Sequence, residues 1–165
     1  MIFEPVLAAL SDAGVRHVVV GGVAVVLHGH PRLTADIDIA LDLSIGAPEK
    51  AVRALAALGL VPLLPIPIED FADAEKRSAW VRDRNLKVFS LWDPNNPLLH
   101  VDLFAEEPMP FDQLWERSVE MVLGDAVIHV ASLPDLIEMK VLAGRPQDLA
   151  DIQALGALHE RRGHD

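Results

Sequence analysis

The stretch GGVAVVLHGHPRLTADIDIAL, residues 21–41, places a glycine pair and two aspartates in otherwise apolar sequence. Gly21 and Gly22 follow a β-branched run, VRHVVV, that predicts a short buried strand. Asp36 and Asp38 belong to ADIDIAL, whose alternation of polar and apolar residues predicts a second strand. Two negative charges so close together in an apolar segment repel each other and require a nearby positive charge or exposure to solvent.

Asp36 and Asp38 are expected on one face of their strand, because successive side chains of a strand point to opposite faces. Two carboxylates about 7 Å apart along a strand repel each other and resist burial. A divalent cation would relieve both problems, and Mg²⁺ favours hard oxygen ligands while it keeps waters for substrate phosphates. An exposed strand edge is the alternative interpretation of the pair.

A third acid, Asp102, lies between apolar residues in the later segment LLHVDLFA. If that strand lies beside the one that carries Asp36 and Asp38, the three acids share a face and suffice for a two-metal site. The glycine pair fits the same interpretation, because glycine lets a backbone approach a phosphate and a helix start offers free N–H groups. Taken without the acids, the glycine pair indicates only a turn.

The rest of the chain alternates between helical and extended patterns. The stretch VPLLPIPI, residues 61–68, holds three prolines and cannot be an interior strand. We expect a mixed α/β (α+β) fold, in which helices flank a mixed sheet. A single domain is expected over residues 1–165, with a core at about 15–130 and a C-terminal helical segment at about 132–161. Helices are predicted at 3–13, 23–27, 48–58, 69–82, 110–119, 132–143 and 146–160, and further strands at 86–91, 98–104 and 126–130.

Composition narrows the function classes. The 165 residues are 51% hydrophobic and carry a formal net charge of −11, which favours a globular protein and argues against tight nonspecific binding of nucleic acid. The chain has no cysteine, which excludes thiol catalysis and thiolate metal sites. Its N-terminus lacks a basic leader and no apolar run is long enough to span a bilayer, so we expect a cytoplasmic protein without a membrane partner.

The motif resembles the nucleotidyltransferase superfamily with the DNA polymerase β fold, and within it the minimal bacterial branch that includes toxins of toxin–antitoxin and abortive-infection systems. The resemblance covers roughly residues 15–155. The C-terminal segment LIEMKVLAGRPQDLADIQAL is similar to the closing segment of that branch. The first pattern, GG-x-A … G-x-x-R-x-T-x-D-h-D, is met by Gly21, Gly22, Ala24, Gly29, Arg32, Thr34, Asp36 and Asp38, and the second by Lys140, Arg145, Asp148 and Asp151.

The resemblance implies a role for each acid and each glycine. Asp36 and Asp38 would bind two Mg²⁺ ions, or Mn²⁺, and Asp102 would bind the catalytic one of the two. Gly21 and Gly22 would cradle the triphosphate of an NTP. Many members of the superfamily have Ser after the first glycine, whereas this chain has Gly22, so that phosphate contact would rest on backbone N–H groups.

The implied reaction transfers a nucleoside monophosphate from an NTP to an acceptor and releases pyrophosphate. The acceptor could be a tRNA 3′ end, a protein hydroxyl or a small molecule, and a toxin of this kind would have an antitoxin protein as partner. The alternative is a noncatalytic module of the same descent, which binds a nucleotide or a partner without turnover.

Other residues carry two interpretations each. Arg32 and Thr34 are candidates for binding phosphate, although Arg32 could instead pair with an acid and hold its loop. Lys140 could bind the triphosphate or extend to water from a helix edge. Arg145 could bind phosphate or favour the end of a helix. A basic segment around Trp80, EKRSAWVRDRNLK, is either an acceptor groove or, as we favour, a solvated helix face.

Asp148 and Asp151 lie near the start of the last predicted helix, where acids favour the helix dipole. A structural role, or an ion pair with Lys140 or Arg145, is the favoured interpretation for both.

Overall fold

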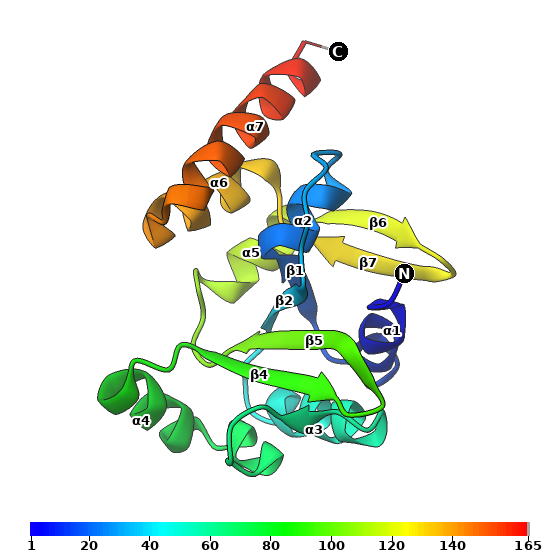
Figure 1. Ribbon diagram of the computed structural model, residues 1–165, viewed down its shortest axis with the longest axis vertical. Helices are drawn as coiled ribbons and strands as arrows, with labels where there is room; N and C mark the ends of the chain where they lie inside the picture. Colours follow the sequence, from blue (N-terminus) through cyan, green and yellow to red (C-terminus); the bar gives the residue numbers. More distant parts are fainter. Residues whose placement is uncertain (165) are drawn as a thin grey trace.

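Within residues 1–164, which the computed structural model describes, a seven-stranded mixed sheet runs in the order β3-β4-β5-β2-β1-β7-β6 (Figure 1). Helices pack against it, which confirms the predicted fold class. The strands are β1 (His17–Val20), β2 (Asp36–Leu41), β3 (Val61–Pro62), β4 (Val88–Asp93), β5 (Asn96–Phe104), β6 (Val119–Leu123) and β7 (Ala126–Val130). The helices are α1 (Glu4–Asp12), α2 (Gly21–Leu27), α3 (Ala47–Ala57), the 3-10 helix η1 (Ile68–Ala72), α4 (Ala74–Arg84), α5 (Phe111–Arg117), α6 (Leu133–Ala143) and α7 (Pro146–Arg162).

The centre of the sheet is built from β1, β2 and β5. β2 runs antiparallel to β1 and parallel to β5. Alternation along β2 and β5 divides their side chains between two faces. Ile37, Ile39, Val101 and Leu103 are fully buried on one face and belong to the main hydrophobic core, which leaves the aspartates on the other.

The helices divide into two groups. α1, α3 and η1 contact one another and supply core residues, whereas α6 and α7 pack together at one end of the molecule (Figure 1, top). Ser132 begins α6 as an N-cap, because its hydroxyl accepts a hydrogen bond from the backbone N–H of Asp135 at 3.2 Å. Gly144 ends α6 in the left-handed conformation. No helix within residues 1–164 is long and apolar enough to cross a membrane.

Three expected helices have clearly different boundaries. The helix expected at 23–27 begins at Gly21, so that the glycine pair forms the start of α2 instead of a turn before it. The helix expected at 110–119 ends at Arg117, and Val119–Leu123 forms β6, which the sequence analysis missed. Gly124, with a positive φ of 60°, and the residue after it connect β6 to β7 as a tight hairpin turn. The helix expected at 69–82 is interrupted at Asp73, whose carboxylate caps α4 by accepting hydrogen bonds from two backbone N–H groups.

The proline-rich stretch at 61–68 contributes only the two residues of β3, at one edge of the sheet. This outcome confirms that the stretch is no interior strand, because Pro62 cannot donate a ladder hydrogen bond.

Candidate active site

Asp36, Asp38 and Asp102, which we call the acid face, lie on two neighbouring strands. Asp38 on β2 is the register partner of Asp102 on β5, and Asp36 is two residues before Asp38 on the same strand. In-register side chains of parallel neighbours point to the same side, about 5 Å apart. The topology therefore brings the three predicted acids together on one face of the sheet.

Asp38 carries the largest electrostatic penalty of the three. Burial raises its pKa to about 7, and the nearby carboxylates of Asp102 and Asp36 contribute to the increase. The positive charges of Arg145 and Lys140 oppose the increase without cancelling it. The surroundings of Asp38 therefore disfavour its charged form, so that near pH 7 this carboxylate is only partly ionised.

Asp102 has a partner that the sequence analysis missed. The hydroxyl of Ser90, on β4, donates a hydrogen bond of 2.6 Å to the Asp102 carboxylate. Burial raises the pKa of Asp102, and this hydrogen bond limits the increase. Ser90 is the register partner of Asp102, so only knowledge of the β4–β5 pairing could have identified it.

The three carboxylates of the acid face do not converge on one point as metal ligands would. As they lie within residues 1–164, no three His, Asp or Glu side chains are close enough together to hold a metal ion. Ligation of metal by the three acids stays a prediction. What the structure establishes is their common face and the register of Asp38 with Asp102.

The glycine pair lies directly against the acid face. Gly21 has a positive φ of 64°, and a Cβ at this position would lie 2.1 Å from a carboxylate oxygen of Asp38. A Cβ on Gly22 would lie 2.9 Å from the Thr34 hydroxyl and 3.3 Å from Thr34 Cβ. A side chain at position 22 would therefore require the Thr34 side chain to shift.

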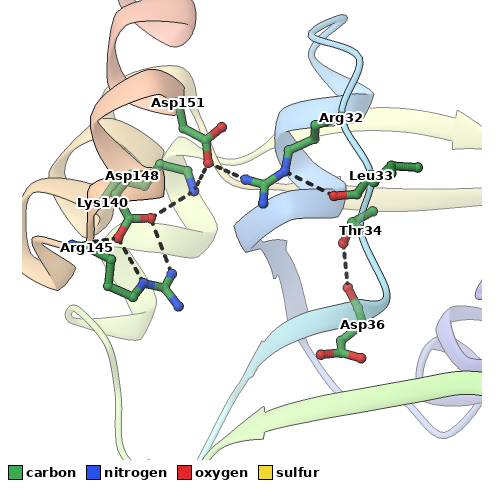
Figure 2. A network of polar contacts seen from close by, with 8 residues as sticks. All are labelled: Arg32, Leu33, Thr34, Asp36, Lys140, Arg145, Asp148 and Asp151. Carbon is green, nitrogen blue, oxygen red and sulfur yellow. Dashed lines mark hydrogen bonds and ion pairs between the residues drawn. The ribbon is translucent and has the colours of Figure 1, made fainter.

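Arg32 and Thr34 hold the loop that leads into β2. The Thr34 hydroxyl donates a hydrogen bond of 3.0 Å to the carbonyl oxygen of Asp36, and Arg32 forms an ion pair with Asp151 of α7 (Figure 2). Of the two interpretations of Arg32, the structure therefore shows the one in which it pairs with an acid.

Arg32 is part of a larger set, which we call the ion-pair network: Arg32, Lys140, Arg145, Asp148 and Asp151 (Figure 2). Lys140 Nζ lies 2.8 Å from Asp151 and 3.6 Å from Asp148, and Arg145 pairs with Asp148 at 2.9 Å. Lys140, Asp148 and Asp151 are at most 5% exposed. The network joins α6, α7 and the loop before β2, and its three cations and two carboxylates leave one positive charge in excess.

A cavity of about 480 Å³ opens between the acid face and α6. Gly21, Asp38, Lys140 and Arg145 line it. The structure thus places one glycine, one acid of the acid face and two cations of the ion-pair network around a single hollow, of a size within the usual range for small-molecule sites.

The basic segment of α4 takes no part in this cavity, apart from Lys87 just beyond the helix. Trp80 is 7% exposed and its ring stacks on Phe89 with centroids 5.2 Å apart, and Arg77 is buried as well. The aromatic ring that would stack on a nucleic-acid base is therefore part of the core.

Comparison with known proteins agrees with this arrangement. A family model described as "Nucleotidyltransferase of unknown function (DUF6036)" matches residues 2–160. The chain belongs to this family. It is a nucleotidyltransferase, and the family match spans both the acid face and the ion-pair network.

A solved structure shares the fold of this nucleotidyltransferase. It is the lincomycin-bound crystal structure of the lincosamide antibiotic adenylyltransferase LnuA, matched with a TM-score of 0.58 and 17% sequence identity over 95% of this chain and 96% of that one. No curated protein matches the chain. At this identity the structural match supports the nucleotidyltransferase fold.

Proposed function

We propose that this nucleotidyltransferase transfers a nucleoside monophosphate from an NTP to an acceptor hydroxyl and releases pyrophosphate. The observation that carries the proposal is the register of Asp38 with Asp102 on parallel neighbouring strands, with Asp36 on the same face and Gly21 against Asp38. The family match supports the reaction class, and the acid face supplies the carboxylates that it needs.

The acid face fits Mg²⁺ by the chemistry of its donors. All three side chains offer carboxylate oxygens, the ligands that this ion prefers. The pKa of Asp38 is raised by burial and by the two nearby carboxylates, and the cations Arg145 and Lys140 offset this only in part. Two bound Mg²⁺ ions, or Mn²⁺, would activate the acceptor oxygen and stabilise the charge on the leaving pyrophosphate. Asp36 and Asp38 would hold both ions and Asp102 one, once its carboxylate turns from Ser90.

The chain's own groups would perform the remaining steps. Gly21 and Gly22 would receive the β- and γ-phosphates on their backbone N–H groups, and the excess positive charge of the ion-pair network would attract them. The acceptor oxygen forms a bond to the α-phosphorus while the bond from the α-phosphorus to the bridging oxygen breaks. The acceptor's proton would pass to Asp102, whose pKa is raised by burial.

Lys140 and Arg145 would bind the triphosphate by exchanging partners. Both already pair with carboxylates of α7, so a phosphate competes with Asp148 and Asp151 for them. Arg32 and Thr34 would contribute mainly by fixing the loop before β2, through the ion pair with Asp151 and the hydrogen bond to Asp36.

Among the acceptor classes, a small molecule has the most support. The net charge of −11 disfavours a polyanionic tRNA end, and the structural match is to an enzyme named as a lincosamide antibiotic adenylyltransferase, which acts on a small molecule. Transfer to a protein hydroxyl or to a tRNA 3′ end is the alternative outcome of the test below. Either acceptor would suit a toxin with an antitoxin partner.

The test is mass spectrometry of RNA, protein and small molecules from cells that express the wild type or Asp38→Asn, combined with a pyrophosphate-release assay. We expect a nucleotide adduct on one acceptor class in wild-type cells alone. Binding of NTP without pyrophosphate release, on all three acceptor classes, would contradict transfer and identify a noncatalytic module.

A further inference from the structure

The cavity beside the acid face extends well beyond the residues that would hold phosphate. Phe104 follows Asp102 by two residues on β5, so both side chains lie on the same face of the strand. Phe104 lines the cavity together with Leu136 and Met139 of α6. The lining therefore combines charged residues of the acid face and the ion-pair network with apolar residues that include one aromatic ring.

This combination matches the two halves of a nucleoside triphosphate. The phosphates suit the side lined by Gly21, Lys140 and Arg145, which offers a close backbone approach and two cations. A flat base suits the apolar part, because aromatic and thioether side chains pack favourably on π-faces. A volume of about 480 Å³ suits a ligand of this size.

Three charged side chains also line the cavity and have no role in the proposed phosphate site. Glu106 and Glu107 lie just after β5, and Lys87 lies just before β4. All three are exposed. The two carboxylates accept hydrogen bonds and repel phosphate, whereas the lysine only donates. A part of the ligand with more donors than acceptors and no negative charge would suit this set of side chains best.

We propose that the cavity binds the nucleoside of the NTP and selects guanine, an inference that rests on the proposed function. The Watson–Crick edge of guanine offers one acceptor, O6, beside two donors, N1–H and the 2-amino group. Lys87 suits the acceptor, and Glu106 and Glu107 suit the donors. Adenine and cytosine each offer a single donor group, and uracil places its one donor between two acceptors, so none of them offers neighbouring donors to both carboxylates.

The test uses calorimetry with Mg²⁺ to measure the binding of five nucleotides. They are the α,β-methylene analogues of GTP, ATP, CTP, UTP and inosine triphosphate. These analogues cannot be cleaved at the bond that transfer breaks. Inosine lacks only the 2-amino group of guanine. We expect the guanosine analogue to bind about tenfold more tightly than the inosine analogue, because inosine lacks the amino group that would donate a hydrogen bond to a carboxylate.

Two variants connect this preference to the residues. The double variant Glu106→Gln with Glu107→Gln should reduce the preference for guanosine over inosine several-fold. Phe104→Leu should weaken all five analogues by a similar factor. Glu138→Gln is the matched control, because Glu138 is exposed on α6 and does not line the cavity. It should leave every affinity unchanged.

Several results would overturn guanine selection. Equal binding of all five analogues, or tighter binding of adenosine, cytidine or uridine analogues, would refute it while leaving nucleotidyl transfer intact. Loss of acceptor use with unchanged nucleotide affinity in the glutamate variants would assign the cavity to the acceptor. Failure of every analogue to bind the wild type would overturn the proposed function as well.

Discussion

The acid face and the ion-pair network hold carboxylates in opposite electrostatic states. In the network, burial would raise the pKa of Asp148, but hydrogen bonds from the side chain and backbone of Arg145 bring it below its ordinary value. On the acid face, burial and neighbouring carboxylates raise the pKa of Asp38 to about 7. Asp38 of the acid face and Lys140 and Arg145 of the network line the same cavity. Only the carboxylates of the network form ion pairs with protein cations.

This difference separates structural charge from functional charge. Paired carboxylates can connect helices and loops, as Asp151 connects Lys140 of α6 with Arg32 of the loop before β2. Unpaired carboxylates on a buried sheet face cost stability, and proteins retain such costs mainly where a ligand requires them. We therefore expect opposite consequences from removing a charge in the two regions.

The largest expected effect is on transfer activity. Asp38→Asn and Asp102→Asn should each reduce the rate of pyrophosphate release by at least about 100-fold, because each removes charge that stabilises the transition state. Asp83→Asn is the matched control, since Asp83 is exposed on α4 and pairs only with Arg82 and its neighbours. Wild-type rates in either acid-face variant would remove the basis for calling these residues catalytic.

A large loss of stability is expected from the network. Asp151→Asn leaves Arg32 without its ion pair and weakens the pairing of buried Lys140, so the free energy of unfolding should fall by about 3 kcal/mol. Urea unfolding measures this change. The same substitution at Asp83 should leave stability almost unchanged, because surface ion pairs contribute little. An equal, small effect at both positions would show that the network does not hold the C-terminal helices.

Asp38→Asn should increase the free energy of unfolding, in contrast to Asp151→Asn, when the protein is freed of metal with EDTA. Since the folded-state pKa of Asp38 lies above its ordinary value of 3.8, charging it opposes folding. The penalty is absent below that value, grows as the pH rises to about 7 and is complete above it. At pH 8 the variant should gain on the order of 2–4 kcal/mol over the wild type.

Thermal unfolding at a series of pH values checks this sign. The gain of Asp38→Asn should shrink steadily as the pH falls toward 4. Excess Mg²⁺ should shrink it as well, by stabilising only the wild type. A variant less stable than the wild type at pH 8 without metal would mean that the Asp38 charge is compensated after all.

The smallest effect is expected at Ser90. Its hydrogen bond lowers the pKa of Asp102, so Ser90→Ala should raise that pKa further and move the acidic limb of the pH–rate profile upward. The maximal rate should change little, because Asp102 is expected to turn away from Ser90 when it binds metal, so that Ser90 acts mainly on the protonation of Asp102 before metal binds. Ser78→Ala, on the surface of α4, serves as control. An unchanged profile would show that Ser90 does not influence the reacting state of Asp102.

Much of the fold and of the acid face could be predicted from local sequence. Asp36 and Asp38 are separated by one residue within a strand pattern, and such spacing fixes their common face. The third acid required a guess about which strands are neighbours, and the β2–β5 pairing confirms it. Strand β6 was missed because it begins two residues after the end of α5, with no clear boundary signal in the sequence between them. Only the turn at Gly124 indicates the hairpin.

Long-range pairing could not be predicted in the same way. Ser90 reaches Asp102 only through the register of β4 with β5, and Arg32 reaches Asp151 across a large separation in sequence. The space above Gly22 is filled by Thr34 because a loop folds back on α2. None of these contacts produces a periodic pattern of residues from which it could be predicted.

The central claim is that Asp36, Asp38 and Asp102 together bind the catalytic metal. A crystal structure with Mn²⁺ and the α,β-methylene analogue of GTP tests it most directly, because Mn²⁺ can be located by its anomalous scattering. We predict Mn²⁺ in contact with all three carboxylates, with Asp102 turned away from Ser90. Mn²⁺ bound elsewhere, with the Ser90–Asp102 hydrogen bond still in place, would contradict the claim.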